Sequence, residues 1–287
     1  MLEKPKQAIV EEMIHALAKI SGVEAIVLGG SYARGVAKAD SDIDLGVYYF
    51  EKTPPSINKI KELAVRFDRA QDSVVSDYYE WGPWVNGGAW LNTKGGKVDW
   101  LYRNIDQVER VIEEAHQGRF AWDYRQQPPH GFFSVMYLAD IRHHIILHDP
   151  KGICARLGAK VQEYPEALRR AIIQEHLWSV EFSFVNAKKF ANRGCVYGTI
   201  GCLTRMAAEL TQVLFALNRD YFVSEKGAMD TIETFAIKPR EFGKKLKGIL
   251  SHPGEGERLI ASLEAFEGLI REVIALAEPI YQPKYIL

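Results

Sequence analysis

The segment from Val27 to Tyr49 constrains the fold of this chain more strongly than any other. It reads VLGGSYARGVAKADSDIDLGVYY, and its apolar runs stand on either side of a Gly-Gly-Ser turn, a short helical stretch and two alternating aspartates. Short apolar runs bounded by glycine, serine and aspartate are typical of buried strands joined by tight turns. We therefore expect one strand to enter the turn at Gly29 and a second strand to begin near Asp44.

The hydrophobic spacing of the first hundred residues predicts alternating helices and strands. Helical spacing covers residues 6–20 and 57–67, and strand-forming runs cover residues 24–28, 44–49, 88–92 and 97–102. Two glycines between the last two strands suit a hairpin. Beyond them, residues 106–116 look helical, 118–131 read as a loop, and 132–148 form an apolar segment that fits either a helix or a strand.

From Pro165 onward, the apolar positions follow a helical period and predict a series of long helices. Strands in the first part and helices in the second favour an α+β protein. We expect an N-terminal α/β domain with a mixed sheet over residues 1–125 and an all-α helical bundle over residues 126–287.

Composition limits the partners that such a chain can have. It has 287 residues with 36 basic and 37 acidic side chains, so its net charge is −1 and no excess of positive charge can follow a nucleic-acid backbone. No uninterrupted run of about 18 apolar residues predicts a membrane span. We expect a cytoplasmic protein that acts on a small molecule and binds neither long nucleic acid nor a membrane. The sequence leaves open whether it forms a homodimer.

The two aspartates Asp42 and Asp44 are the first candidates for chemistry. They stand two residues apart where the chain enters a strand, so both carboxylates point to the same face. Two carboxylates so close repel each other unless a cation lies between them, and Mg²⁺ prefers hard oxygen ligands of this kind. A turn or a solvated strand end is the alternative for an isolated Asp-x-Asp pair.

The turn before the aspartates suits a phosphate group. Gly29 and Gly30 allow a ligand to approach the backbone closely, and the amides of Gly30 and Ser31 together with the Ser31 hydroxyl can donate hydrogen bonds to an anion. Arg34 could reach the same phosphate, although a solvated helix position suits it equally well. On a later strand, Asp99 is a candidate third carboxylate that could complete a two-metal site and accept a proton.

At this point the pattern resembles a known family. Gly30 and Ser31, followed by Asp42, Asp44 and a later strand with Asp99, are similar to the motif of the DNA polymerase beta-like nucleotidyltransferase superfamily. Within it, GGSYARG, SDIDL and a helical C-terminal half are most similar to the bacterial small-substrate branch, which includes aminoglycoside and lincosamide adenylyltransferases.

The resemblance implies transfer of a nucleoside monophosphate from a nucleoside triphosphate, usually ATP, to a hydroxyl of a small acceptor, with two Mg²⁺ ions and release of pyrophosphate. The resemblance also implies that the glycine-serine turn holds the triphosphate. In the same way, Asp42 and Asp44 are expected to bind both metals. Asp99 binds the metal at the acceptor and is a candidate base. A lysine from the second domain often neutralises the triphosphate in this family, and Lys226 is the candidate here.

Two other functions remain as alternatives. One is an enzyme that adenylylates a partner protein, as antitoxins of this superfamily do. The other is a nucleotide-binding regulator without transfer activity. In the helical half, Arg205 and Glu209 are spaced at i and i+4 and are expected to form a surface ion pair.

Overall fold

The computed structural model describes residues 3–70, 72–251 and 254–285, and the chain forms two compact units. The first unit comprises Met1–Glu113 and Ala121–Glu163, and the second comprises Glu114–Phe120 and Tyr164–Leu287. A strand from the segment after residue 125 joins the sheet of the first unit. For this reason the first unit reaches beyond the boundary expected between residues 125 and 126.

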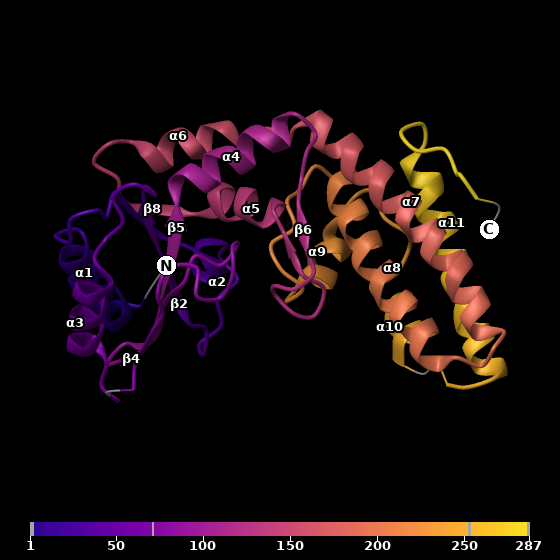
Figure 1. Ribbon diagram of the computed structural model, residues 1–287, viewed down its shortest axis with the longest axis horizontal. Coiled ribbons are helices and arrows are strands. Elements are labelled where there is room, and N and C mark those ends of the chain that lie inside the picture. The colour runs from indigo at the N-terminus through magenta and orange to yellow at the C-terminus, as the bar shows by residue number, and fades with distance from the viewer. Residues whose placement is uncertain (1–2, 71, 252–253, 286–287) are drawn as a thin grey trace. The chain divides into compact units, whose positions relative to one another are not determined.

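A six-stranded sheet forms the centre of the first unit (Figure 1). Its strand order is β3-β4-β5-β2-β1-β8. The strands are β1 (Ala25–Leu28), β2 (Ile43–Tyr49), β3 (Val74–Val75), β4 (Gly88–Thr93), β5 (Gly96–Asn104) and β8 (Ile145–His148). β2 and β5 run parallel, whereas the other neighbouring pairs are antiparallel, which confirms the expected mixed sheet.

Two helices cover one face of this sheet. They are α1 (Lys4–Leu17) and α3 (Ile57–Phe67), which lie together on one side of the strands in Figure 1. Their apolar stripes share a buried core with alternate residues of β2 and β5, including Ile43, Leu45 and Trp100. Because strand side chains alternate between faces, the residues between these core positions face the other side.

The opposite face of the sheet carries the aspartates and is partly covered by later segments. α5 (Val135–His143) contacts it through Asp140, whose carboxylate lies 2.7 Å from the Arg103 guanidinium on β5. The remaining elements of this unit are α2 (Gly30–Ala33), α4 (Ile105–His116), α6 (Ile153–Lys160) and a small hairpin of β6 (Trp122–Asp123) and β7 (Phe132–Phe133). The segment 118–131, expected to be a loop, therefore contains one short strand.

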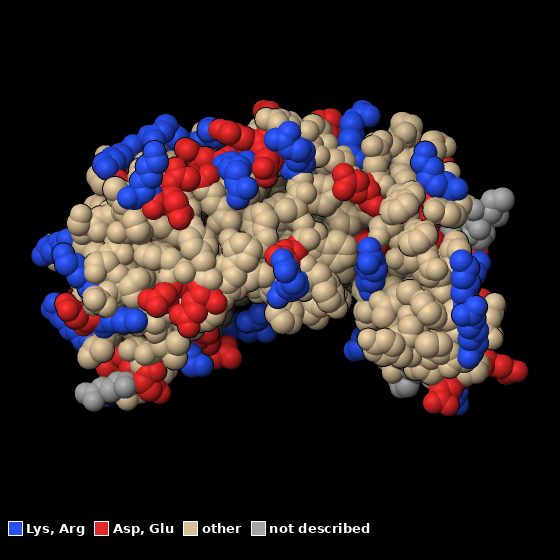
Figure 2. Space-filling view, viewed as in Figure 1, with Lys and Arg blue, Asp and Glu red and all other residues tan. Residues whose placement is uncertain are grey.

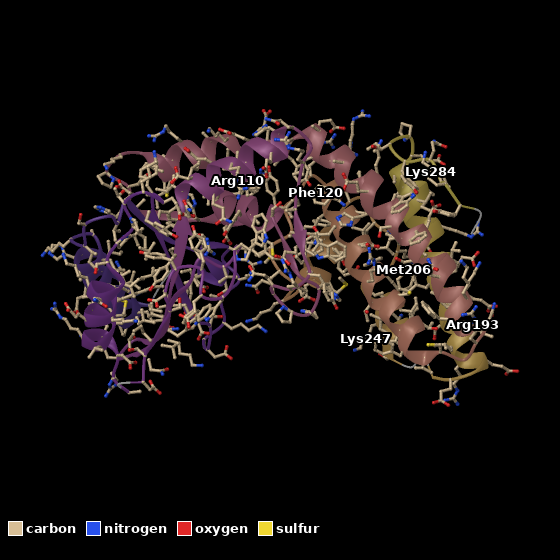
Figure 3. All side chains as sticks on the ribbon, in the orientation of Figure 1. Arg110, Phe120, Arg193, Met206, Lys247 and Lys284 are labelled. Carbon is tan, nitrogen blue, oxygen red and sulfur yellow. The ribbon has the colours of Figure 1, made fainter. Side chains whose placement is uncertain are left out.

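The second unit is helical, which confirms the expected α+β class. It contains α7 (Glu166–Ala191), α8 (Val196–Leu217), α9 (Ala228–Thr234), α10 (Phe242–Ser251) and α11 (Glu257–Ala277). α8 packs along α7, and Met206 of α8 is fully buried (Figure 3). α8 is long and apolar enough to cross a membrane by length and composition alone, but 72% of its most apolar window is buried inside the protein. Such burial is typical of a core helix of a soluble protein.

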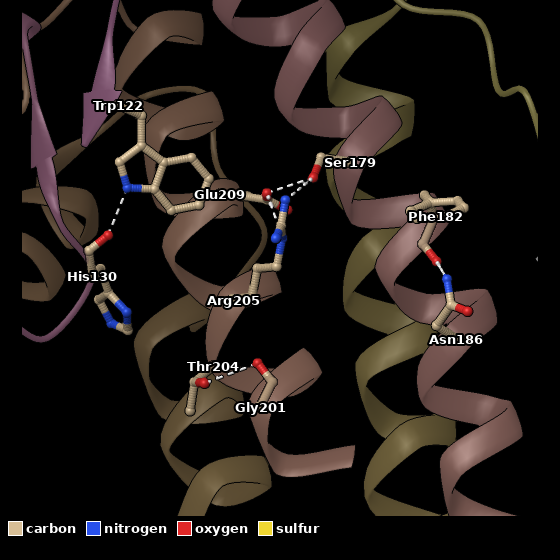
Figure 4. Close-up of polar contacts among 9 residues, drawn as sticks. All are labelled: Trp122, His130, Ser179, Phe182, Asn186, Gly201, Thr204, Arg205 and Glu209. Atoms are coloured by element: carbon tan, nitrogen blue, oxygen red, sulfur yellow. Dashed lines mark hydrogen bonds and ion pairs between the residues drawn. The ribbon is translucent and has the colours of Figure 1, made fainter. Parts of the chain in front are cut away.

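Arg205 and Glu209 form the expected ion pair, but its acidic member is buried and does not lie at the surface. Glu209 is fully buried, and its Oε1 accepts a hydrogen bond from the Ser179 hydroxyl at 2.6 Å and lies 3.3 Å from Arg205 Nε (Figure 4). Burial raises the pKa of Glu209 to about 7, against the lowering effects of Ser179 and Arg205. The i, i+4 spacing brings the two side chains together, and the packing of α8 against α7 turns the carboxylate inward.

Candidate functional site

The glycine turn lies directly against the start of β2. Gly29 donates its backbone N–H to the carbonyl of Asp44 at 2.8 Å. Gly30 has a positive φ of 59°, and a Cβ at this position would lie 1.8 Å from Oδ2 of Asp44. Only glycine meets both requirements, because other residues rarely adopt this backbone conformation and have no room beside the carboxylate. The two glycines thus allow the turn to approach the aspartate.

Asp99 lies beside Asp44 on the same face of the sheet. The parallel pairing of β2 and β5 places Asp44 opposite Asp99, at the usual strand spacing of about 4.8 Å. The expected adjacency of the two strands is therefore confirmed. On its other side, Asp99 is opposite Trp90 of β4.

The charge of Asp99 is disfavoured by its surroundings. Burial, then the Asp44 carboxylate and then the Asp42 carboxylate raise the pKa of Asp99 from 3.8 to about 7, while Lys97 and a hydrogen bond from the Trp90 side chain lower it. All three predicted acidic residues are thus close enough to interact electrostatically. This mutual repulsion is the condition that a divalent cation would relieve.

The three carboxylates are not arranged as a metal-binding site in this structure. Among residues 3–70, 72–251 and 254–285, no group of three or more His, Cys, Asp and Glu side chains is arranged to hold an ion. Oδ2 of Asp44 is turned toward Gly30. The donor chemistry of Asp42, Asp44 and Asp99 fits Mg²⁺, but binding of an ion by all three requires their side chains to reorient.

The other residues singled out in the sequence occupy different places. Ser31 is the second residue of α2 and is partly exposed, next to Gly30. Arg34 caps the same short helix, and its Nε lies 3.4 Å from the carbonyl oxygen of Gly30, so it borders the turn. Lys226 is exposed and belongs to the second unit. Its predicted contact with the triphosphate therefore stays a prediction, as do the ligand-binding roles of the other residues.

A pocket beside Asp44 involves residues that the sequence did not single out. It measures about 170 Å³ and is lined on the sheet by Asp44, Gly46 and Arg103 and on the α5 side by Asp140 and His144. The alternation of β5 could have revealed Arg103, since residues 99, 101 and 103 share a face. Nothing in the local sequence places Asp140 and His144 there, because their position depends on how α5 packs.

Comparison with known proteins gives two matches along the chain. Residues 10–85 match the nucleotidyltransferase domain, and residues 133–226 match a domain of unknown function, DUF4037. The first match contains the glycine turn together with Asp42 and Asp44, and it ends before Asp99. The second contains Asp140, His144 and Lys226. No curated protein matches the sequence.

Among solved structures, the fold is similar to that of a nucleotidyltransferase-like protein from Exiguobacterium sibiricum 255-15. The identity is 11% and the TM-score is 0.46, over 96% of this chain and 77% of that chain. Residues 10–85, which match the nucleotidyltransferase domain, contain the turn and two of the three carboxylates.

Proposed function

We propose that this protein transfers a nucleoside monophosphate, in the first instance AMP from ATP, to a hydroxyl group of a small molecule and releases pyrophosphate. The observation that carries the proposal is the pairing of Asp44 with Asp99 on parallel strands, immediately beside the Gly29–Ser31 turn. The nucleotidyltransferase domain over residues 10–85 supports nucleotidyl transfer in general.

The proposed reaction forms one bond and breaks one bond at the α-phosphorus. The acceptor oxygen attacks this phosphorus, the bond to the bridging oxygen of pyrophosphate breaks, and the hydroxyl proton leaves for a base. Asp99 is the proposed base, because its carboxylate lies beside Asp44 on the same face of the sheet and can accept the hydroxyl proton.

The same carboxylates would hold two Mg²⁺ ions. When bound, these ions would neutralise the triphosphate and stabilise the charge that develops in transfer. Asp42 and Asp44 are proposed to bind both ions and Asp99 the one on the acceptor side. The electrostatic effect of Asp44 and Asp42 on Asp99 supports a shared cation.

The triphosphate is proposed to lie on the glycine turn. With only four residues, α2 contributes little helix dipole, so the backbone amides of Gly30 and Ser31 would supply most of the hydrogen bonds. Gly29 leaves room for this approach, and Arg34 borders the turn. Lys226 remains a candidate for neutralising the phosphates.

A small acceptor suits the charge of the protein. The net charge is −1, and acidic and basic side chains are interspersed on the face drawn in Figure 2. This distribution supports a small hydroxylated molecule in preference to a long polyanion, whose binding depends on many basic contacts.

The test is pyrophosphate release by the full-length protein with ATP, Mg²⁺ and a panel of aminoglycosides, lincosamides and sugars. We expect Asp42→Asn and Asp44→Asn each to lower the rate by about 100-fold or more, since several kcal/mol of transition-state stabilisation are lost. Asp40→Asn is the control, because Asp40 is exposed and lies just before the pair.

Unchanged release in the Asp42 and Asp44 variants would refute the proposed mechanism. Tight ATP binding without turnover of any acceptor would favour the nucleotide-binding regulator. A mass increase of one adenylate on a co-purifying protein would favour the enzyme that modifies a partner protein.

A further inference from the structure

Residues 35–41 form a linking loop between the glycine turn and β2. Most of the hydrogen bonds of this loop are local. Val36 donates its backbone N–H to the carbonyl of Ser31 at 3.0 Å, Lys38 donates its N–H to the Ser41 hydroxyl at 2.9 Å, and Ser41 donates its N–H to the carbonyl of Lys38 at 3.0 Å. Local bonds of this kind fix the shape of the loop, but they do not fix its position relative to the sheet.

Lys6 of α1 connects the linking loop to the rest of the unit. Its Nζ donates one hydrogen bond to the carbonyl oxygen of Ala39 at 3.2 Å and another to the hydroxyl oxygen of Tyr32 at 2.5 Å. The ammonium also lies 5.2 Å from the centre of the Tyr32 ring, and this ring packs against the buried core. In the described part of the chain, no other side chain from outside the turn and the loop hydrogen-bonds to the loop. The loop is therefore held to α1 at a single side chain.

The hairpin that precedes Asp99 packs on α1 at the same place. A Cβ at Gly95 would lie 2.6 Å from a methyl carbon of Ile9 and 3.5 Å from Cα of Lys6, and a Cβ at Gly96 would lie 3.9 Å from Cε of Lys6. The hairpin backbone thus rests directly on the beginning of α1. Lys6 lies where the linking loop and the hairpin that leads to Asp99 both meet this helix.

Asp42 is the carboxylate whose position depends most on the linking loop. It stands three residues after Ala39 and just before β2, which begins at Ile43. None of the described residues donates a hydrogen bond to the Asp42 carboxylate. Asp44, in contrast, lies within β2 and is paired with Asp99 of β5. Without a bond of its own, the Asp42 carboxylate follows the backbone of the loop.

We propose that Lys6 is a positioning residue for the proposed metal site. Its two hydrogen bonds hold the linking loop, and with it Asp42, at the distance from Asp44 and Asp99 at which the three carboxylates can share a cation. This inference rests on the proposed function, in which these carboxylates bind Mg²⁺. It gives a role in the site to a residue outside the segment 10–85 that matches the nucleotidyltransferase domain.

Hydrogen–deuterium exchange of the metal-free, full-length protein tests whether Lys6 holds the loop. Lys6→Met removes the donor and keeps most of the aliphatic stem. We expect this variant to speed up exchange of the backbone amides of Val36, Lys38 and Ser41 by about 5-fold or more, because the loop opens more often. Lys4→Met is the matched control, since Lys4 is exposed on the same helix, and it should leave these amides unchanged.

Binding of Mn²⁺, a paramagnetic substitute for Mg²⁺, tests the consequence for the metal site. Electron paramagnetic resonance of free Mn²⁺ measures its affinity in the presence of a non-hydrolysable ATP analogue, after subtraction of the Mn²⁺ that the analogue binds alone. We expect Lys6→Met to weaken Mn²⁺ binding about 10-fold, the equivalent of one hydrogen bond, and Lys4→Met to change it less than about 2-fold.

Two further variants separate the role of the ammonium group from loss of fold. Lys6→Arg can still donate to both oxygens and should bind Mn²⁺ within about 3-fold of the wild type. Tyr32→Phe keeps the packed ring and removes one of the two partners of Lys6, so it should weaken Mn²⁺ binding by about 3-fold. A melting curve of each variant shows whether it is folded, and Tyr32→Phe carries the test if Lys6→Met is not.

The outcomes separate this inference from the proposed function. Unchanged amide exchange in Lys6→Met, or faster exchange with unchanged Mn²⁺ binding, would overturn the positioning role of Lys6. Equal effects of Lys4→Met would overturn it as well. Pyrophosphate release that depends on Asp44 would still support the proposed function in those cases. If the wild type binds no Mn²⁺ together with the ATP analogue, the proposed metal site fails and this inference fails with it.

Discussion

Replacing Asp99 by asparagine tests the electrostatics of the site without any substrate. The change keeps the size of the side chain and an oxygen that can accept the hydrogen bond from Trp90, but it removes the charge that Asp44 and Asp42 repel. We expect Asp99→Asn to stabilise the metal-free protein at pH 8. Such a gain would show that the carboxylate is retained at a cost to the fold.

The size of this gain follows from the pKa of Asp99. Each pKa unit corresponds to about 1.4 kcal/mol, so a rise from 3.8 to about 7 would equal about 4 kcal/mol for a fully buried group. Asp99 is partly exposed, and water screens part of the repulsion. We therefore expect a gain of about 1–2 kcal/mol.

The gain depends on pH in a defined direction. Because the folded state binds the Asp99 proton more tightly than the unfolded state, the wild type loses stability as pH rises from about 4 to about 7, and Asp99→Asn does not. The difference in unfolding free energy between Asp99→Asn and the wild type should reach its full size at pH 8 and be about half as large at pH 5. Added Mg²⁺ should reduce this difference at pH 8, because a cation relieves the repulsion among the carboxylates of the wild type.

Urea denaturation with a chelator present, followed by tryptophan fluorescence, measures the effect. All tryptophans except Trp178 lie in the first unit, so the signal reports mainly on the unit that contains Asp99. Glu113→Gln is the charge-matched control, since Glu113 is exposed on α4 and should change stability by less than about 0.5 kcal/mol. A destabilised Asp99→Asn, or a gain of equal size at pH 5 and pH 8, would contradict this account.

Two further substitutions test the turn and the helical unit. Gly30→Ala should lower the free energy of unfolding, measured by urea denaturation, by about 1–2 kcal/mol. It should also weaken Mg-ATP binding, measured by titration calorimetry, because the new Cβ displaces Asp44. Gly35→Ala is the control and should keep nucleotide binding, because Gly35 also has a positive φ but a Cβ there would have no neighbour within 4 Å. Arg205→Met should lower stability by about 1–3 kcal/mol at pH 8 and less at pH 6, measured by circular dichroism, because the buried Glu209 is then ionised without its partner. Adding Glu209→Gln should restore most of this loss, and no recovery would refute the assignment.

Local sequence patterns were sufficient to predict the helices and strands at the centre of the first unit. The helix expected over residues 57–67 has these bounds in the structure, and the hairpin before Asp99 forms as its glycines indicated. Asp44 and Asp99 could be placed on one face because both stand between core residues of their own strands. The period of two residues in a strand is enough for this step.

Features that depend on contacts between distant segments could not be predicted in the same way. The apolar segment 132–148 contains β7, α5 and β8, and its spacing alone fits either a helix or a strand. β3 and β6 have two residues each and are too short for a periodic signal. The pocket beside Asp44 could not be predicted for the same reason, since the position of Asp140 and His144 depends on how α5 packs.

The pairing of β8 with β1 decides how much of the chain is needed to produce the first unit alone. A fragment that stops at residue 85 or 125 lacks Ile145–His148 and would leave the backbone N–H and C=O groups along one side of β1 without their partners. An exposed sheet edge with unpaired backbone groups is a template for aggregation. Truncated versions of this protein should therefore extend through β8, even though the nucleotidyltransferase match ends sixty residues earlier in the chain.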